Sequence, residues 1–173
     1  GMDTYKIEIE ADVSKGQQAF DIVGLPDSAV RESRDRVRSA IKNCGYKYPL
    51  GHITVNLAPA DVRKEGSAYD LPVLVALLIA NKQINPTINL EESIFIGEVS
   101  LDGSIRSVNG ILSMAIGAKE MGIKNFFVPA ENAGEGSVIE GINIYGVRTV
   151  GELIGHIVGK QPLTPTEPFD ISQ

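Results

Sequence analysis

Apolar and polar residues alternate in two early stretches of the chain, and this period of two predicts β-strands. The first stretch covers residues 5–13, and the second, Ala19–Val23, follows the turn residues Lys15 and Gly16. Because only a short turn separates them, we expect the two strands to pair as a hairpin. Residues 53–57 are also apolar at alternate positions and predict a third strand.

A helix is predicted from Asp27 to about Cys44, since its apolar residues recur at helical spacing. Asp27 follows the strand-breaking residues Gly24 and Pro26 and is expected to cap the helix, and Gly45 is expected to end it. The apolar positions that support this helix are Val30, Val37, Ile41 and Cys44.

A second helix is predicted over residues 70–80, and it is apolar on nearly all sides. Asp70 is expected to cap this helix. Pro72 is tolerated in the first turn, because no intrahelical hydrogen bond is lost there. A helix without a polar face must be covered by the rest of the domain, so we expect it at the centre of the fold.

The second half of the chain alternates strands with helices. Residues 93–100 and 105–108 flank Asp102 and Gly103, a pair that predicts a tight hairpin because both residues tolerate positive φ. The order of elements indicates an α+β domain, a mixed sheet with packed helices. The remaining predicted elements are a helix over residues 110–121 and strands over residues 125–128 and 142–147.

A closing helix and a proline-rich tail end the chain. Thr149 and Glu152 form a capping-box pattern at the start of that helix. Residues 159–173 contain several prolines and are predicted to form an extended linker toward a further domain. We interpret residues 1–2 as a cloning scar, which leaves residues 3–158 as one domain.

Composition narrows the class of protein. A chain of 173 residues with 43% hydrophobic content can form one sizeable core. A net charge of −6 argues against binding nucleic acid by bulk neutralisation of phosphates. Cys44 stands alone and no secretory signal is evident, which favours the cytoplasm. The apolar run of residues 71–80 is too short to span a bilayer, so we expect a soluble protein without a membrane partner.

Three motifs carry a family resemblance. They are FDIVGLPDSAVRESRDRVRSAIKN at residues 20–43, ITVNLAPADVRKEGSAYDLPVLVALL at residues 53–78 and a longer motif at residues 96–132. Together they resemble the N-terminal domain of the ComM/YifB family of magnesium-chelatase-like AAA+ proteins. The resemblance implies a Lon-protease-like fold of the ribosomal-protein β-α-β type. It also implies a following ATPase module that binds ATP and Mg. No Gly-x-x-x-x-Gly-Lys-Ser/Thr phosphate loop occurs in these 173 residues, so we expect no cofactor here.

The same resemblance points to a protease active site that has lost its catalytic residues. The Lon loop reads roughly Lys-Asp-Gly-Pro-Ser-Ala-Gly, whereas residues 64–70 read KEGSAYD, which places Ala68 at the nucleophile and Leu112 at the lysine of the dyad. Neither side chain can generate an alkoxide. The less favoured alternative is a shifted dyad of Ser67 with Lys64, against the simpler interpretation of a loop hydroxyl and a solvated turn.

A basic stripe is predicted on the helix that begins near Asp27. We call Arg31, Arg34, Arg38 and Lys42 the basic stripe, since their spacing of three and four residues places them on one face. Pairing of Glu32 with Arg36 and of Arg31 with Asp35 would neutralise part of that helix surface. A solvated helix face is the simpler interpretation, and contact with phosphate or with another subunit is the alternative.

Function is predicted from the family resemblance and the lost dyad together. We expect a non-catalytic accessory domain of a ComM-type ATPase, which in this family resembles a hexameric DNA helicase promoting branch migration during natural transformation. The expected partners are its own C-terminal AAA+ domain, further copies of itself, and DNA. A residual peptidase and a protein-interaction module remain as alternatives. His52 and His156 lie in unrelated elements, so no metal site is expected.

Overall fold

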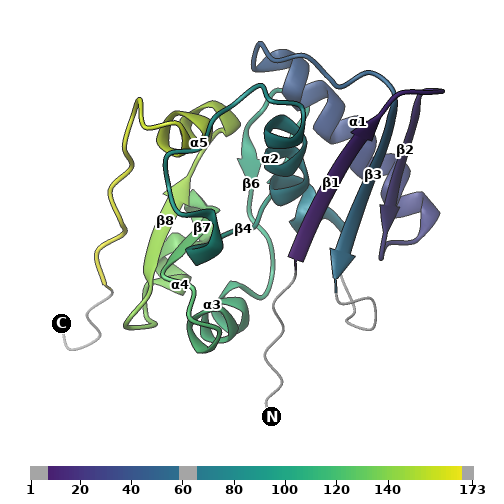
Figure 1. The fold of residues 1–173 in the computed structure, drawn as a ribbon. Coiled ribbons are helices and arrows are strands. Elements are labelled where there is room, and N and C mark those ends of the chain that lie inside the picture. Colours follow the sequence, from purple (N-terminus) through teal and green to yellow (C-terminus); the bar gives the residue numbers. More distant parts are fainter. Residues whose placement is uncertain (1–7, 59–65, 169–173) are drawn as a thin grey trace.

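Two three-stranded sheets stand on either side of a central helix in the computed structural model, which describes residues 8–58 and 66–168. Figure 1 shows helix α2 (Asp70–Ala80) between the two sheets. The first sheet contains β1 (Glu8–Ser14), β2 (Ala19–Val23) and β3 (His52–Ala58). The second sheet contains β4 (Ser93–Phe95), β7 (Asn125–Pro129) and β8 (Asn143–Val147).

The first sheet has the order β1-β3-β2, so the predicted hairpin of the two early strands is wrong. Strand β3 lies between them, antiparallel to β1 and parallel to β2. Gly51 permits this insertion, because its φ is +106° and a Cβ there would collide with the carbonyl oxygen of Ser14. Central position also suits Ile53 and Val55 of β3, whose side chains are fully buried.

Helix α1 (Asp27–Asn43) packs against α2 and β2 and confirms the predicted helix. Its N-cap residue is Pro26, and no side chain makes a capping hydrogen bond, so the predicted Asp27 cap is wrong. Asp27 instead lies in the first turn, where a carboxylate interacts favourably with the helix dipole. Gly45 has φ +85° just beyond the helix, as expected for its end.

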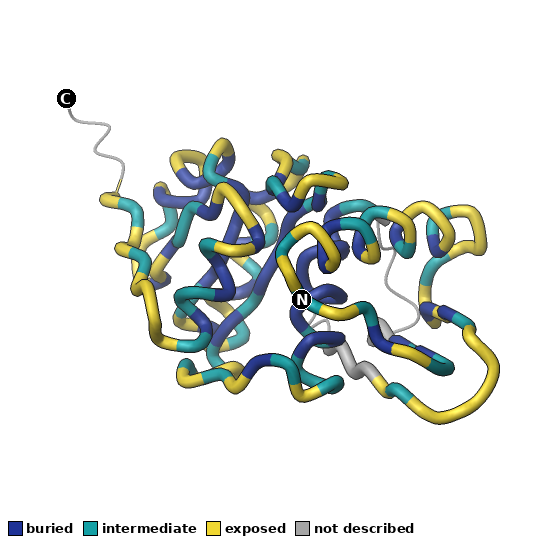
Figure 2. The backbone as a smooth tube through the Cα atoms, turned by 90° about the horizontal axis from the view of Figure 1, so that it is seen from above, coloured by how far each residue is buried: buried dark blue, intermediate teal, exposed yellow. Residues whose placement is uncertain are grey.

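Helix α2 is buried along most of its length, which confirms its predicted central place. A single-turn 3₁₀ helix, η1 (Gly66–Tyr69), leads directly into it. Figure 2 shows the buried backbone gathered in the interior and the exposed backbone around the periphery. The fully buried apolar side chains of α2 are Leu71, Val73, Leu74, Leu77 and Leu78.

The predicted strand over residues 93–100 is broken in two. β4 ends at Phe95, and β5 (Glu98–Val99) then pairs antiparallel with β6 (Ile105–Arg106). Between β4 and β5 the chain leaves the sheet, because the N–H of Gly97 donates to the carbonyl of Ala68 at 2.9 Å. The predicted hairpin is confirmed, although among the two turn residues only Gly103 has a positive φ.

The second half of the chain contains parallel strands and short helices. Aromatic rings on adjacent strands of the β4-β7-β8 sheet stack against one another. Phe127 lies between Phe95 and Tyr145, with ring centroids 4.9 and 4.7 Å away. The parallel register places these residues side by side on adjacent strands. The remaining elements are η2 (Leu90–Glu92), α3 (Ile111–Glu120), η3 (Ala130–Asn132), α4 (Ala133–Gly136) and α5 (Val150–Ile157).

Residues 160–168, here called the C-terminal strap, run beyond α5 without helix or strand. Figure 1 shows the strap descending along the side of the β8 sheet. The N–H of Thr166 donates to the carbonyl of Ile144 at 2.7 Å, and Leu163 packs against the core. These contacts hold the segment to the domain. Its role as a linker stays a prediction.

The whole arrangement is of the α+β class, as predicted, with the parallel and antiparallel pairings shared between small separate sheets. Thr149 caps α5 as expected, since its hydroxyl accepts from the N–H of Glu152 at 3.0 Å. Within residues 8–58 and 66–168, no helix has the length and apolar character needed to cross a membrane.

Candidate functional site

The junction of η1 and α2 contains Ala68, the residue that the Lon resemblance predicts at the nucleophile position. This assignment stays a prediction. Ala68 is 6% exposed. Its carbonyl accepts from Gly97, and the carbonyl of Gly97 accepts from the N–H of Leu71 at 3.0 Å. The backbone of this junction is thus bonded to the segment between β4 and β5, and the junction presents a methyl group without chemistry.

Leu112, which the resemblance predicts at the second dyad position, lies at the start of α3 and is 38% exposed. Its backbone N–H donates to a carboxylate oxygen of Glu135 at 3.2 Å. The side chain carries no titratable group. In Figure 1, α3 lies at the lower edge of the molecule, below the level of α2.

The alternative dyad is described only in part. Ser67 lies in η1 and is partly buried, whereas Lys64 lies outside the described residues. Pairing of the Ser67 hydroxyl with the Lys64 amine therefore stays a prediction. Glu65, the other residue assigned to a solvated turn, also lies outside the described residues.

Asp70, at this junction, accepts four hydrogen bonds from three residues. Its carboxylate is completely buried and accepts two hydrogen bonds from the Arg36 guanidinium, Nε at 2.6 Å and Nη2 at 3.1 Å. The hydroxyl of Ser33 donates to Oδ1 at 2.8 Å, and the N–H of Val99 donates to Oδ2 at 3.2 Å. One carboxylate therefore joins α1, α2 and β5.

This arrangement corrects two predictions. Asp70 is not a helix cap, because the N-cap residue of α2 is Tyr69 and no side chain caps this helix. Arg36 binds Asp70 rather than serving as the predicted partner of Glu32. One sequence signal could have predicted that Asp70 pairs with a cation. It is a lone carboxylate in the first turn of an otherwise apolar helix, since a buried charge requires a partner.

Burial and pairing act in opposite directions on this carboxyl group. Burial raises the pKa of Asp70, while the hydrogen bonds from Arg36 and Ser33 oppose that shift. The hydrogen bond to Asp70 raises the pKa of Arg36, so the guanidinium stays charged. An acid whose lone pairs are all directed at structural donors is poorly placed to serve as a general base.

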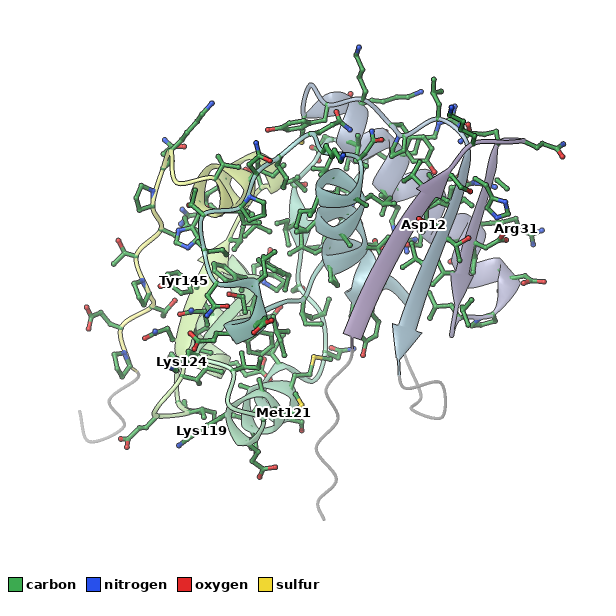
Figure 3. The ribbon with its side chains drawn as sticks, viewed as in Figure 1. Asp12, Arg31, Lys119, Met121, Lys124 and Tyr145 are labelled. Carbon is green, nitrogen blue, oxygen red and sulfur yellow. The ribbon has the colours of Figure 1, made fainter. Side chains whose placement is uncertain are left out.

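The basic stripe lies along the solvent side of α1. Arg31, Arg38 and Lys42 are exposed, and Arg34 is partly buried. In Figure 3, Arg31 lies at the side of the molecule opposite Tyr145. Asp35 pairs with Arg34, Oδ1 to Nε at 3.3 Å, rather than serving as the predicted partner of Arg31. The stripe thus keeps three exposed cations beside one partly neutralised arginine.

Tyr48 packs beneath this stripe and was not found from the sequence. The guanidinium carbon of Arg38 lies 5.5 Å from the centroid of the Tyr48 ring, within the range of a cation–π interaction. Burial raises the pKa of Tyr48 to about 12, with Arg38 and Arg34 opposing the shift. The ring fixes the direction of Arg38 on the exposed face of α1.

The described residues contain no cluster of three or more His, Cys, Asp or Glu side chains that could hold a metal ion. His52 pairs with Asp21, Nε2 to Oδ2 at 2.9 Å, on the exposed face of the first sheet. His156 lies in α5, in the other half of the molecule.

Taken together, these elements define a domain of the α+β class, in which Ala68 lies at the junction of η1 and α2. The Lon protease of Koribacter versatilis is 23% identical to this chain over 161 residues, which cover 84% of the chain and 19% of that protease. This similarity is compatible with a Lon-like fold.

The family itself follows from closer matches. The family model described as subunit ChlI of Mg-chelatase matches residues 9–132. The chain therefore belongs to this magnesium-chelatase-like family. It is 41% identical to the uncharacterized protein YifB of Escherichia coli K12 over 98% of the chain, and 37% identical to the competence protein ComM of Haemophilus influenzae over 94%. It spans 33% of YifB and 32% of ComM.

Proposed function

We propose that this domain is a non-catalytic accessory domain of a ComM-type AAA+ ATPase. The observation that carries the proposal is the buried Ala68 at the nucleophile position, with its carbonyl bonded to Gly97. Engagement of Asp70 by Arg36, Ser33 and Val99 supports it further, because the polar groups at this junction serve the fold. Substrate turnover would then belong to another part of the protein.

In this proposal, ATP and Mg bind only the ATPase module that the family resemblance implies. The 173 residues contain no P-loop pattern, and the described residues gather no metal-ligand cluster. The full protein would work as a hexameric DNA helicase in branch migration, natural transformation and recombination, in the cytoplasm. This domain would contribute to assembly of the ring or to guidance of DNA.

DNA guidance is supported by the basic stripe alone. Three exposed cations on α1 could contact successive phosphates, although the net charge of −6 leaves the rest of the surface unfavourable to nucleic acid. Tyr48 would hold Arg38 in position for such a contact. Assembly of the ring through the same helix face is the competing use of the stripe.

Deleting residues 3–158 from the full-length protein tests the accessory role. We expect DNA-stimulated ATP hydrolysis or strand migration to fall at least tenfold, with the ATPase module still folded by circular dichroism. Retention of both activities at their normal rates would contradict the proposal.

Charge reversal separates the uses of the basic stripe. Arg31→Glu combined with Arg38→Glu should weaken DNA binding at least tenfold and reduce its salt dependence, if the stripe contacts phosphates. Each of these two single reversals is compared with Lys119→Glu, which makes the same change of charge at an exposed position on α3. Normal DNA binding with altered oligomer mass would favour ring assembly, and a change in neither would favour a protein-interaction module.

The residual-peptidase alternative has its own test. An electrophilic serine probe should leave the folded full-length protein unlabelled at Ser67 under conditions in which its ATPase is active. Labelling that disappears in Ser67→Ala would overturn the non-catalytic proposal in favour of the Ser67–Lys64 dyad.

A further inference from the structure

The C-terminal strap is attached to the domain through a histidine. The N–H of Leu163 donates to Nδ1 of His156, near the end of α5, at 2.9 Å. On either side of this bond the strap is attached through backbone groups. Lys160 and Gln161 donate to the carbonyl of Gly155 at 2.9 and 3.0 Å, and Thr166 donates to that of Ile144 at 2.7 Å. His156 thus supplies the one side-chain acceptor among these four attachments.

The imidazole of His156 lies against the aromatic stack of the second sheet. Its centroid is 5.3 Å from the ring of Phe127 and 5.2 Å from that of Tyr145. Figure 3 shows the Tyr145 side chain in the part of the molecule beside the strap. Leu163 packs against the same core and is partly buried. The ring is therefore enclosed by apolar surface on one side and by the strap on the other.

Few ionisable groups belong to the elements around this ring. Burial is the cause that lowers the pKa of His156 below its ordinary value of 6.5. Strands β4 and β7 present Phe95 and Phe127 to the stack, and neither residue titrates. The ionisable residues on the surrounding segments are Tyr145 on β8, Glu152 on α5, Lys160 and Glu167 in the strap, and Lys82 in the loop whose Thr87 donates to the carbonyl of Ile157.

We propose that His156 is a proton-controlled latch, which holds the strap when its imidazole is neutral and releases it when the imidazole is protonated. The bond from Leu163 requires a lone pair on Nδ1. In the imidazolium both ring nitrogens carry protons, so Nδ1–H would face the Leu163 N–H donor to donor. Protonation therefore removes one attachment and places a charge against the apolar stack.

The direction of the pH effect follows from linkage. Burial lowers the pKa of His156 in the latched state, and the bond from Leu163 requires an unprotonated Nδ1. Release removes that requirement, so the released state should bind the proton more tightly. Latching is fully favoured above the ordinary pKa of 6.5 and weakens as the pH falls from there through the lowered value. Release frees the Ile144 carbonyl at the edge of β8 and uncovers one side of Leu163.

NMR on the 173-residue chain tests this latch by following the His156 ring and the backbone amides across pH 4.5–8. We expect the amide protection factors of Leu163 and Thr166 to fall at least tenfold as His156 is protonated. The protection of Val128 and Leu153, in the core, should stay unchanged. Strap protection that stays constant through the His156 titration, or a His156 that never titrates in this range, would overturn the proposal.

Two variants distinguish the effect of the hydrogen-bond acceptor at His156 from the effect of its positive charge. His156→Asn keeps an oxygen acceptor near the Nδ1 position and cannot be protonated, so the strap should stay protected at every pH. His156→Phe keeps an aromatic ring without an acceptor, so Leu163 should exchange freely at every pH. A wild-type pH response in His156→Asn would show that another group controls the strap, and normal protection of Leu163 in His156→Phe would show that the bond is dispensable.

Discussion

The two halves of this domain are stabilised by different kinds of interaction. The first half contains α1, α2 and the β1-β3-β2 sheet, and the second contains the β4-β7-β8 sheet. In the first half, α1 and α2 meet over a buried carboxylate, Asp70, which Arg36 neutralises and which Ser33 and Val99 also bind. In the second half, the sheet is held by stacked rings, with Phe127 between Phe95 and Tyr145. A buried ion pair thus stabilises the interior of the first half, and stacked aromatic rings stabilise that of the second.

The two halves differ in whether the polar group packed against the core of each is fully used by the fold. In the first half, Asp70 lies at the end of the segment that resembles a protease active site, and its carboxylate is engaged by α1 and β5. In the second half the one polar ring against the apolar stack, His156, holds a segment of chain that lies outside the sheet. His156, rather than Asp70, is therefore the residue for which we propose a role beyond stabilising the fold.

Phe127→Ala should have the largest effect, because it removes the middle ring of the stack. A fully buried phenylalanine replaced by alanine costs about 3–5 kcal/mol of the free energy of unfolding. Urea denaturation monitored by circular dichroism would measure it. Phe127→Leu, which keeps most of the volume, is the control and should cost under about 1.5 kcal/mol. Equal losses in the two variants would show that the volume filled by the ring is not what stabilises this half.

Arg36→Met tests the charged half and should cost about 3 kcal/mol, since it leaves a buried carboxylate without its cation. The folded pKa of Asp70 would then rise further above its unfolded value. The deficit relative to wild type should shrink as the pH falls toward that raised pKa, because protonation removes the unpaired charge.

Denaturation at several pH values would show this dependence. Ser33→Ala removes a single hydrogen bond of the same cluster and should cost only about 1 kcal/mol. A deficit for Arg36→Met that stays constant with pH would contradict the assignment of Asp70 as the buried charge.

Gly97→Ala probes the segment between the two halves. A Cβ at this position would lie 2.8 Å from Cγ2 of Ile105 and 3.4 Å from Cδ2 of Leu71. Overpacking of this kind costs about 1–3 kcal/mol. Thermal denaturation would measure the loss, and Gly134→Ala, where a Cβ meets nothing within 4 Å, is the control. A neutral Gly97→Ala would show that the two halves can move apart cheaply.

Thr149→Ala should have the smallest effect, confined to the start of α5. Loss of an N-cap hydroxyl costs about 1 kcal/mol. Thr149→Ser keeps the hydroxyl that accepts from Glu152 and should restore most of the stability. Urea denaturation of both variants would decide, and a cost that Thr149→Ser shares would assign the effect to the lost methyl group.

Local patterns predicted most elements but not their pairing. Helices α1, α2, α3 and α5 and strands β2, β3, β7 and β8 follow from periodicity and end signals, which depend on neighbours in the sequence. The early hairpin was wrong, because insertion of β3 depends on residues some forty positions away. The long strand before Asp102 was wrong because Gly97 pairs with Ala68, a contact invisible to any local rule.

The candidate site divides in the same way. The sequence predicts that both dyad positions are replaced, by Ala68 and Leu112, and this assignment stays a prediction. The partners of Asp70 could not be read from the sequence, because Arg36, Ser33 and Val99 approach it from two other elements. Tyr48 was missed for the same reason, since it packs beneath α1 from the connection that follows the helix.

The sequence by itself determined the family and the class of fold, because both follow from residue identity and order along the chain. The missing nucleophile stays a prediction. Only the tertiary structure decided that Asp70 is a buried ion-pair centre and that His156 holds the strap. A charge or a ring acquires its role from what surrounds it, and for Asp70 the surroundings come from segments about thirty residues before and after it in the sequence.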